Sequence, residues 1–150
     1  MTVGPFPVSQ AIAHLRAAAP LLQIVGGAAD LATALAQTPT RPTAAYITAA
    51  ELGRAIKYTG PVAIQQCDVT LRVVLFVRNF GMAGTGESAR DQMDLEVIPQ
   101  VRQALFGWAP GDQYDALWFQ AGRDESYAAG WLVSQQVFGT NYRLSKQVQP

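Results

Sequence analysis

Cysteine and histidine are almost absent from this chain of 150 residues, which contains one of each. The single cysteine, Cys67, excludes a disulfide within the chain and a cysteine-based metal site. Its position in a strand-like run predicts a buried, inert thiol. The single histidine, His14, excludes a histidine-rich metal cluster, and its neighbours Ala13 and Leu15 favour a packed or surface side chain over a catalytic base. We therefore expect no catalytic residue, no metal and no cofactor.

Long apolar segments and a net charge are also missing. No apolar run approaches the ~20 residues of a transmembrane helix, and the first residues lack the features of a signal peptide. We therefore expect synthesis in the cytoplasm and no membrane partner. Eleven acidic residues balance eleven basic ones, whereas dedicated nucleic-acid binders are usually basic. The length and the apolar content of 49% predict a single domain, residues 1–150, that folds without crosslinks.

Charge is distributed unevenly along the chain. From Glu87 to Glu125, eight acidic residues stand against three arginines, so this segment carries −5 and the remainder of the neutral chain +5. Two interpretations remain open: the charges pair within the monomer, or they form faces of opposite sign that favour head-to-tail contacts between copies. Nine of the eleven cations are arginine, which suits protein interfaces and is equally expected from a GC-rich genome.

The hydrophobic pattern predicts an α+β fold: a central, mostly antiparallel β-sheet packed by a long kinked helix and one or two shorter helices. Within Val62–Phe80, alternate residues from Val69 to Val77 are apolar, which indicates a strand with one buried face. After Ser88, apolar residues recur every fourth position from Met93 to Leu105 and indicate the long helix. Pro99 interrupts this pattern and should kink the helix.

The other expected elements are short, and serine, glycine and proline mark their ends. Serine favours the cap position before a helix, which gives Ser9 and Ser88 that role. Ranges for these elements are a first helix at Gln10–Ala19, a short helix at Asp30–Ala36, strands at Ala44–Thr48, Ala116–Ala121 and Gly130–Tyr142, a loop or hairpin tip at Ala49–Gly60, a turn at Gly122–Glu125 and a frayed tail after Leu144.

The glycine-rich segment Gly81–Ser88 fits a phosphate-binding loop at every defined position except one. It follows an apolar strand and precedes a helix, as such loops do. Glu87 stands where the motif requires a lysine that contacts the β- and γ-phosphates. Like charges ~4 Å apart repel by about 4 kcal/mol at an effective dielectric constant of 20. We therefore do not expect nucleotide binding or an enzyme, and a small nucleotide-binding enzyme remains an alternative that a binding assay would test.

Five segments, taken in order, resemble the tail terminator proteins of long-tailed bacteriophages. The order and spacing of the segments carry the resemblance, which covers most of the chain, because each segment alone is weakly specific. These segments are Val25–Leu31, Pro42–Ile47, Val74–Asn79, Leu105–Pro110 and Leu117–Arg123. The resemblance implies a structural virion protein of the bacteriophage tail that carries out no catalysis.

The resemblance further implies a homohexameric ring at the head-proximal end of the tail tube. Such a ring ends tube polymerisation and forms the docking surface for the head-tail connector, or stopper, protein, and DNA crosses its lumen only in transit. Another head-tail connector or a tail tube subunit is the alternative within phage assembly. Long glycine-containing segments at strand ends are expected to supply axial or lumen contacts, and Trp108 either plugs the end of the long helix or contacts a partner. The candidate interface or lumen residues are Arg54, Lys57, Tyr58, Asn79, Met82, Glu87 and Trp108.

Overall fold

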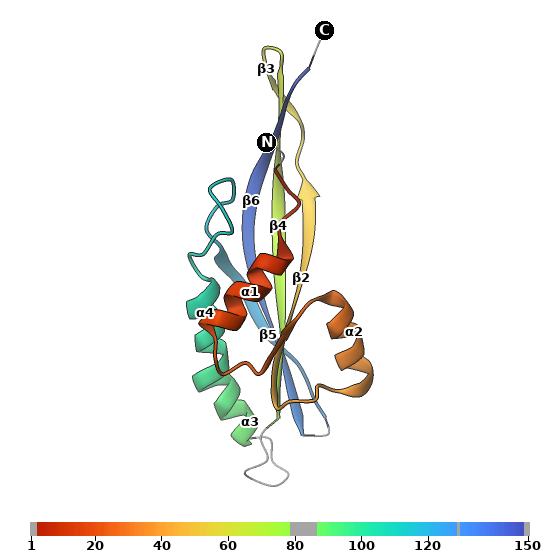
Figure 1. The fold of residues 1–150 in the computed structure, drawn as a ribbon, viewed down its shortest axis with the longest axis vertical. Helices are drawn as coiled ribbons and strands as arrows, with labels where there is room; N and C mark the ends of the chain where they lie inside the picture. Colours follow the sequence, from red (N-terminus) through yellow and green to blue (C-terminus); the bar gives the residue numbers. More distant parts are fainter. Residues whose placement is uncertain (1–2, 79–86, 129, 149–150) are drawn as a thin grey trace.

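The computed structural model describes residues 3–78, 87–128 and 130–148, which form an α+β fold around a six-stranded sheet (Figure 1). Its strand order is β1-β2-β4-β6-β5, with β3 paired to β4, and every pairing except β1 with β2 is antiparallel. The predicted fold class is therefore confirmed. In chain order the elements are α1 (Val8–Ala18), β1 (Ile24–Gly26), α2 (Ala28–Gln37), β2 (Thr43–Gly53), β3 (Lys57–Thr59), β4 (Val62–Arg78), α3 (Glu87–Gln92), η1 (Met93–Val97), α4 (Ile98–Leu105), β5 (Trp118–Ala128) and β6 (Trp131–Gln147).

Strand β4 is the centre of the sheet. It pairs with β6 along its whole length, from Val62 opposite Gln147 to Arg78 opposite Trp131. The alternate apolar residues predicted to share a face, from Val69 to Val77, are all at most 1% exposed. The period-two pattern of this strand therefore identified the buried face correctly.

Helices α1, α3 and α4, together with η1, cover this face and form the main core. The apolar residues that repeat along the long helix are fully buried in it, with Leu15 of α1 and Phe138 of β6 among their neighbours in the cluster. Burial of this apolar surface is the main favourable term that holds the helices on the sheet. The predicted stripe consists of Met93, Val97, Val101 and Leu105.

The long helix is interrupted before Pro99, as predicted. Residues Met93–Val97 form a π-helical turn in which the amide N–H of Ile98 donates to the carbonyl of Met93, five residues back. Pro99 then lies in the first turn of α4, where its missing N–H is tolerated. A proline ring clashes with the carbonyl four residues before it in a regular α-helix, and a π-helical turn is one established way to relieve that clash.

Helix α2 packs on the opposite face of the sheet, where a smaller cluster forms. Its buried Ala34 contacts a group that contains Tyr46, Phe76 and Trp131. The rings of Tyr46 and Phe76 meet edge to face at 5.6 Å, and those of Phe76 and Trp131 at 6.3 Å. Because α2 covers only one corner, the rest of this face has no helix over it in the described part of the chain.

The segment Ala49–Gly60 was expected to be a loop or hairpin tip, and this prediction is wrong for most of it. Strand β2 continues to Gly53, which lies opposite Cys67, and β3 adds a short strand beside the start of β4. The tail after Leu144 was expected to fray, yet β6 continues to Gln147. Cross-strand pairing with β4 stabilises residues 49–53 and 145–147, and neither stretch carries the β-branched and aromatic residues that mark a strand locally.

The predicted turn at Gly122–Glu125 is also wrong, because β5 runs through it to Ala128 with irregular register on either side. A Cβ atom at Gly122 would lie 2.8 Å from the side-chain nitrogen of Gln136. This glycine therefore permits a close approach between strands rather than a turn. Both predicted caps are likewise wrong: α1 begins at Val8 after Pro7, and α3 begins at Glu87, which places Ser9 and Ser88 inside the helices.

Candidate functional site

Three strands continue beyond the helical layer and form what we call the arm. It consists of β3 with residues Val62–Gln66 of β4 and Arg143–Gln147 of β6, and it is the narrow upper end of the molecule in Figure 1. No helix lies over it among the described residues. The arm therefore presents both of its faces to solvent and to partners.

Exposed apolar side chains lie on the arm. Tyr58 is opposite Ala63, which is opposite Lys146, so these three residues share one face. Leu144 lies on the same face, since it is opposite Gln65, two positions farther along β4. Tyr58 is 65% exposed and Leu144 is 40% exposed. Large apolar side chains gathered on an uncovered ribbon are typical of an interaction surface.

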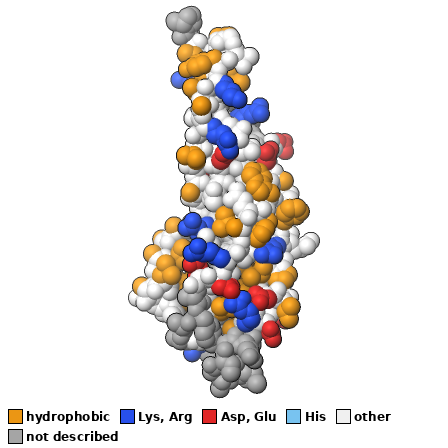
Figure 2. Space-filling model, turned by 180° about the vertical axis from the view of Figure 1, so that it is seen from behind, with side chains coloured by type: hydrophobic (Ala, Val, Ile, Leu, Met, Phe, Trp, Pro, Cys, Tyr) orange, Lys and Arg blue, Asp and Glu red, His pale blue; other side chains and the backbone are white. Residues whose placement is uncertain are grey.

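The arm is also cationic. Residues 55–66 and 143–148 contain Lys57, Arg143 and Lys146 and no acidic residue. None of these three cations has an ion pair within the described residues. Seen from behind, lysine and arginine side chains lie among apolar and uncharged atoms along this narrow end (Figure 2). Two candidate residues, Lys57 and Tyr58, thus lie together on an exposed element, although their interface role remains a prediction.

Arg54 has a different environment from the other two candidates in its segment. Its guanidinium forms an ion pair with Asp68 of β4 at the base of the arm, and its backbone carbonyl accepts a hydrogen bond of 2.7 Å from Gln65. The pKa of Asp68 is lowered, first by the hydrogen bond from Gln66 and then by that from Arg54. Arg54 therefore fixes the path of the chain between β2 and β3.

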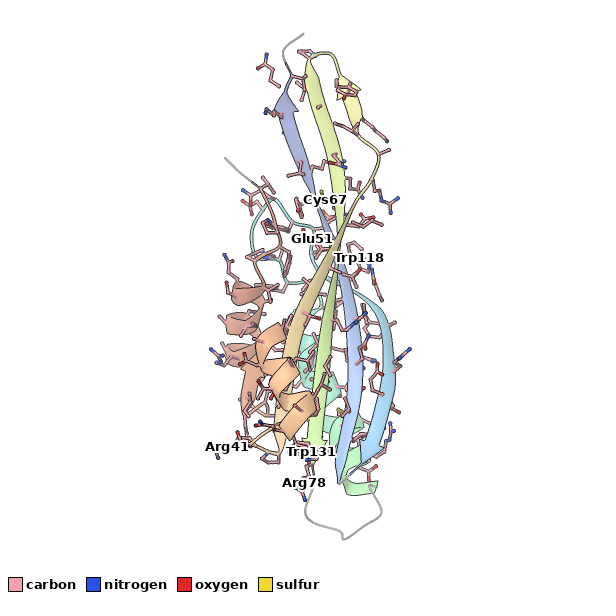
Figure 3. The ribbon with its side chains drawn as sticks, turned by 90° about the vertical axis from the view of Figure 1, so that its right-hand side faces the viewer. Arg41, Glu51, Cys67, Arg78, Trp118 and Trp131 are labelled. Atoms are coloured by element: carbon pink, nitrogen blue, oxygen red, sulfur yellow. The ribbon has the colours of Figure 1, made fainter. Side chains whose placement is uncertain are left out.

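A compact polar cluster marks the point where the arm leaves the helical layer. Glu51 and Cys67 lie close together there (Figure 3), and the hydroxyl of Tyr142 interacts with both. Burial, followed by the hydrogen bond and charge of Glu51, raises the pKa of Tyr142. Cys67 is buried, as predicted. The cluster anchors β2, β4 and β6 to one another.

Trp108 closes the end of the long helix. Its ring stacks on the imidazole of His14 at 4.5 Å with an interplanar angle of 7°, and Nε2 of His14 lies 2.8 Å from the carbonyl oxygen of Ala104. Gly107, with a φ of 82°, begins the turn that follows α4. His14 is thus a packed side chain, and Trp108 has the plugging role that we considered for it. An additional contact of Trp108 with a partner stays a prediction.

A second apolar surface follows the solvent side of the long helix, and sequence reasoning missed it. We call this surface the helix strip: Leu95 and Pro99, then Phe106 at the end of α4 and Phe119 on β5. Leu95 is 72% exposed and Phe106 66% exposed. The strip includes a groove of about 340 Å³ between α4 and Phe119, which is also lined by Arg102. The Arg102 guanidinium lies 4.2 Å from the centre of the Phe119 ring and donates a hydrogen bond to Gln136. The sequence signal for this surface was Leu95 and Phe106, two large apolar residues that lie outside the predicted buried stripe.

Acidic side chains rim the first part of the helix strip. Asp91, Asp94 and Glu96 are exposed around Leu95. Arg90 forms an ion pair with Asp94 and another with Asp124. Asp91 and Glu96 form no ion pair within the described residues. The ion pairs of the acidic segment use its own arginines, Arg90 and Arg123. Pairing within the monomer therefore accounts for part of the segment's charge and leaves an acidic surface.

Three candidates fall in or beside the glycine-rich segment. Asn79 and Met82 lie outside the described residues, as does the body of the phosphate-loop pattern, so these predictions are untested. Glu87 is the first residue of α3. In the parts of the chain that the structure describes, no group of three or more His, Cys, Asp or Glu side chains could hold a metal ion. No helix there has the length and apolar character needed to cross a membrane.

Comparison with known proteins identifies the family of this fold. A search of individual curated proteins finds no match. The sequence model of the family described as "Phage tail terminator protein" matches residues 1–149, which is nearly the whole chain. This agrees with the resemblance that the ordered segments suggested. The chain therefore belongs to the phage tail terminator protein family, a family of structural proteins, and is a component of the bacteriophage tail.

Proposed function

We propose that this protein caps the head-proximal end of the tail tube as a ring of six copies. The ring ends polymerisation of the tube and forms the docking surface for the head-tail connector protein. Membership of the tail terminator family over residues 1–149 is the observation that carries this proposal. DNA crosses the lumen of the ring in transit, and the protein acts without catalysis.

Termination makes a physical demand on such a subunit. One of its surfaces must match the exposed end of the tube, and another must fail to recruit the next tube subunit, so that growth stops. The uncovered arm at one end of the sheet and the helical layer at the other supply two chemically different surfaces in one chain (Figure 1). Two different surfaces are what a cap requires, because one can bind the tube while the other does not recruit the next tube subunit.

Removal of the protein from an assembling phage tests the proposal. Without it, tails should grow beyond their normal length and fail to join heads, and supply of the protein in trans should restore both. Electron microscopy of the particles measures tail length and head attachment. Tails of normal length in its absence would contradict the proposal.

The behaviour of the purified protein separates a terminator from the alternatives. A terminator should form closed rings, alone or on tube ends, whereas a tail tube subunit should form long tubes. Native mass spectrometry and electron microscopy distinguish the two. Tube formation by this chain alone would favour the tube-subunit alternative.

The predicted contact residues have a test of their own. Charge reversal at Lys57 should reduce tail termination or head joining, with Arg41→Glu as a control at an exposed cation outside the arm. Arg54→Glu also breaks the ion pair with Asp68, so it needs a check of folding by circular dichroism. If termination and head joining survive both reversals in folded protein, this segment has no part in the contacts.

A further inference from the structure

The arm and the helix strip complement each other, and we propose that the arm of one copy docks on the helix strip of a neighbouring copy. This inference rests on the proposed ring and specifies the contact between its subunits. The arm carries exposed Tyr58 and Leu144 on one face together with Lys146, and Lys57 and Arg143 on the other face of the same narrow ribbon. The helix strip carries exposed Leu95 and Phe106 with an acidic rim.

Apolar complementarity is the first argument. Tyr58 and Leu144 share a face of a three-stranded ribbon, and no described helix or strand covers their exposed side chains. The helix strip is a ridge with a groove between α4 and Phe119. Burial of these side chains against each other would remove both exposed apolar surfaces from water, which is the main favourable term in association.

Charge complementarity is the second argument and selects the occupant. The arm contains no acidic residue. Lys146 lies on the face of Tyr58 and Leu144, whereas Lys57 and Arg143 lie on the other face of the two edge strands, β3 and β6. None of these three cations is ion-paired within the described residues. Asp91 and Glu96, on the rim of the helix strip, form no ion pair within the described residues either. Opposite charges at the edge of an apolar contact favour the correct partner and speed its encounter. A second copy of this chain supplies both halves of such a contact.

The positions of the two surfaces require the contact to be between copies. The arm extends from one end of the sheet, whereas α3 and the start of the helix strip lie toward the other end (Figure 1). A chain therefore cannot place its own arm on its own strip. A contact between two different surfaces of identical subunits is head-to-tail and closes into a ring when its rotation permits.

Charge exchange in the full chain tests the contact. The arm-reversed variant carries Lys57→Glu with Lys146→Glu, and the helix-reversed variant carries Asp91→Lys with Glu96→Lys. Each should weaken self-association by at least about tenfold, measured by sedimentation and native mass spectrometry. A chain with all four substitutions, or an equal mixture of the two variants, should associate as the unmodified protein does, because every arm again meets a strip of opposite charge.

Matched controls are available at exposed charges away from both surfaces. Arg41→Glu and Asp112→Lys each reverse one charge of the same kind elsewhere, and neither should alter association. Circular dichroism and thermal unfolding show whether each variant is folded. Folded variants that associate like the unmodified protein overturn the contact, and so does a failure of the fourfold exchange to restore association.

If the purified protein is monomeric, the contact between arm and helix strip is tested on assembled tails. Leu144→Cys and Leu95→Cys, introduced together, should give a crosslink between copies at the tail end, and each alone should not. Absence of that crosslink, or a crosslink from the arm to tube protein instead, overturns the contact. A ring that persists in the arm-reversed variant alone and in the helix-reversed variant alone overturns the contact but not the ring. A closed dimer that depends on both surfaces supports the contact and contradicts the proposed ring.

Discussion

Strands β4 and β6 pass through two regions with different physical environments. In the lower region, helices cover one face, and β4 residues such as Leu71 and Leu75 are fully buried. In the arm, the same two strands stay paired, yet apart from the small side chain of Ala63 their side chains are half-buried or exposed. A short ribbon without a covering layer is marginal in water, so the arm depends on the covered region that holds its strands in register. Its exposed apolar side chains are thus available for a partner.

Matched leucine truncations should give the largest effect and the clearest contrast between the regions. Leu71→Ala removes a fully buried side chain and should lower the free energy of unfolding by about 2–5 kcal/mol, because it leaves a cavity. Leu144→Ala on the arm should lower it by less than about 1 kcal/mol. Urea unfolding followed by circular dichroism measures both values. Equal losses would show that the arm is covered in the monomer.

A substitution at His14 tests whether its contact with Trp108 stabilises the end of the long helix. His14→Ala removes both the ring stack and the hydrogen bond near Ala104, and it should lower the free energy of unfolding by about 1–2 kcal/mol. Gln10→Ala, at an exposed position on the same helix, is the control and should change it by less than about 0.5 kcal/mol. If the two substitutions prove equivalent, the stack contributes nothing to the closure.

Alkaline pH should weaken the junction between the two regions. Burial raises the pKa of Tyr142 above its ordinary value of 10.0, so the folded state favours the neutral phenol. This contribution is fully present below pH 10 and is lost as pH rises from there through the pKa of the folded state. The urea midpoint should therefore fall above pH 10, and Tyr142→Phe should remove this dependence. Exposed Tyr58→Phe is the control and should leave the alkaline fall in place.

Acid pH should produce the smallest effect, at the base of the arm. Hydrogen bonds from Gln66 and then Arg54 lower the pKa of Asp68 below its ordinary value of 3.8. The stabilisation is present above that value and is lost as pH falls through the pKa of the folded state. Asp68→Asn should flatten the acid side of the stability curve slightly, whereas Asp112→Asn should not. If the curve for Asp68→Asn is unchanged, this ion pair does not stabilise the base of the arm.

The parts of the fold that could be predicted are those whose signal is local. The alternation from Val69 to Val77 and the helical repeat from Met93 to Leu105 each marked a buried face, because burial of one side imposes the period of the element. Pro99 located the interruption of the helix, since its ring acts on its own backbone. Lys57 and Tyr58 were also named from their position near a strand end, and their role as contact residues stays a prediction.

The parts that could not be predicted depend on pairing between distant segments. Residues 49–53 and 145–147 are strands because β4 offers them backbone partners, and Gly122 lies within a strand because Gln136 occupies the space beside it. The helix strip went unrecognised because Leu95 and Phe106 read as ordinary helix residues. They lie outside the predicted stripe, but only their exposure in the folded chain shows that they form a surface.

By itself the sequence determined the fold class, the main buried faces, the lack of a disulfide and a charge that is unevenly spread. It did so because periodicity, proline geometry and charge are properties of neighbouring residues. The tertiary structure alone decided how far the strands extend, where the arm lies and which charges stay unpaired. Those features arise from contacts between residues far apart in the chain, such as Arg90 with Asp124 and Tyr142 with Glu51, and no local pattern encodes them.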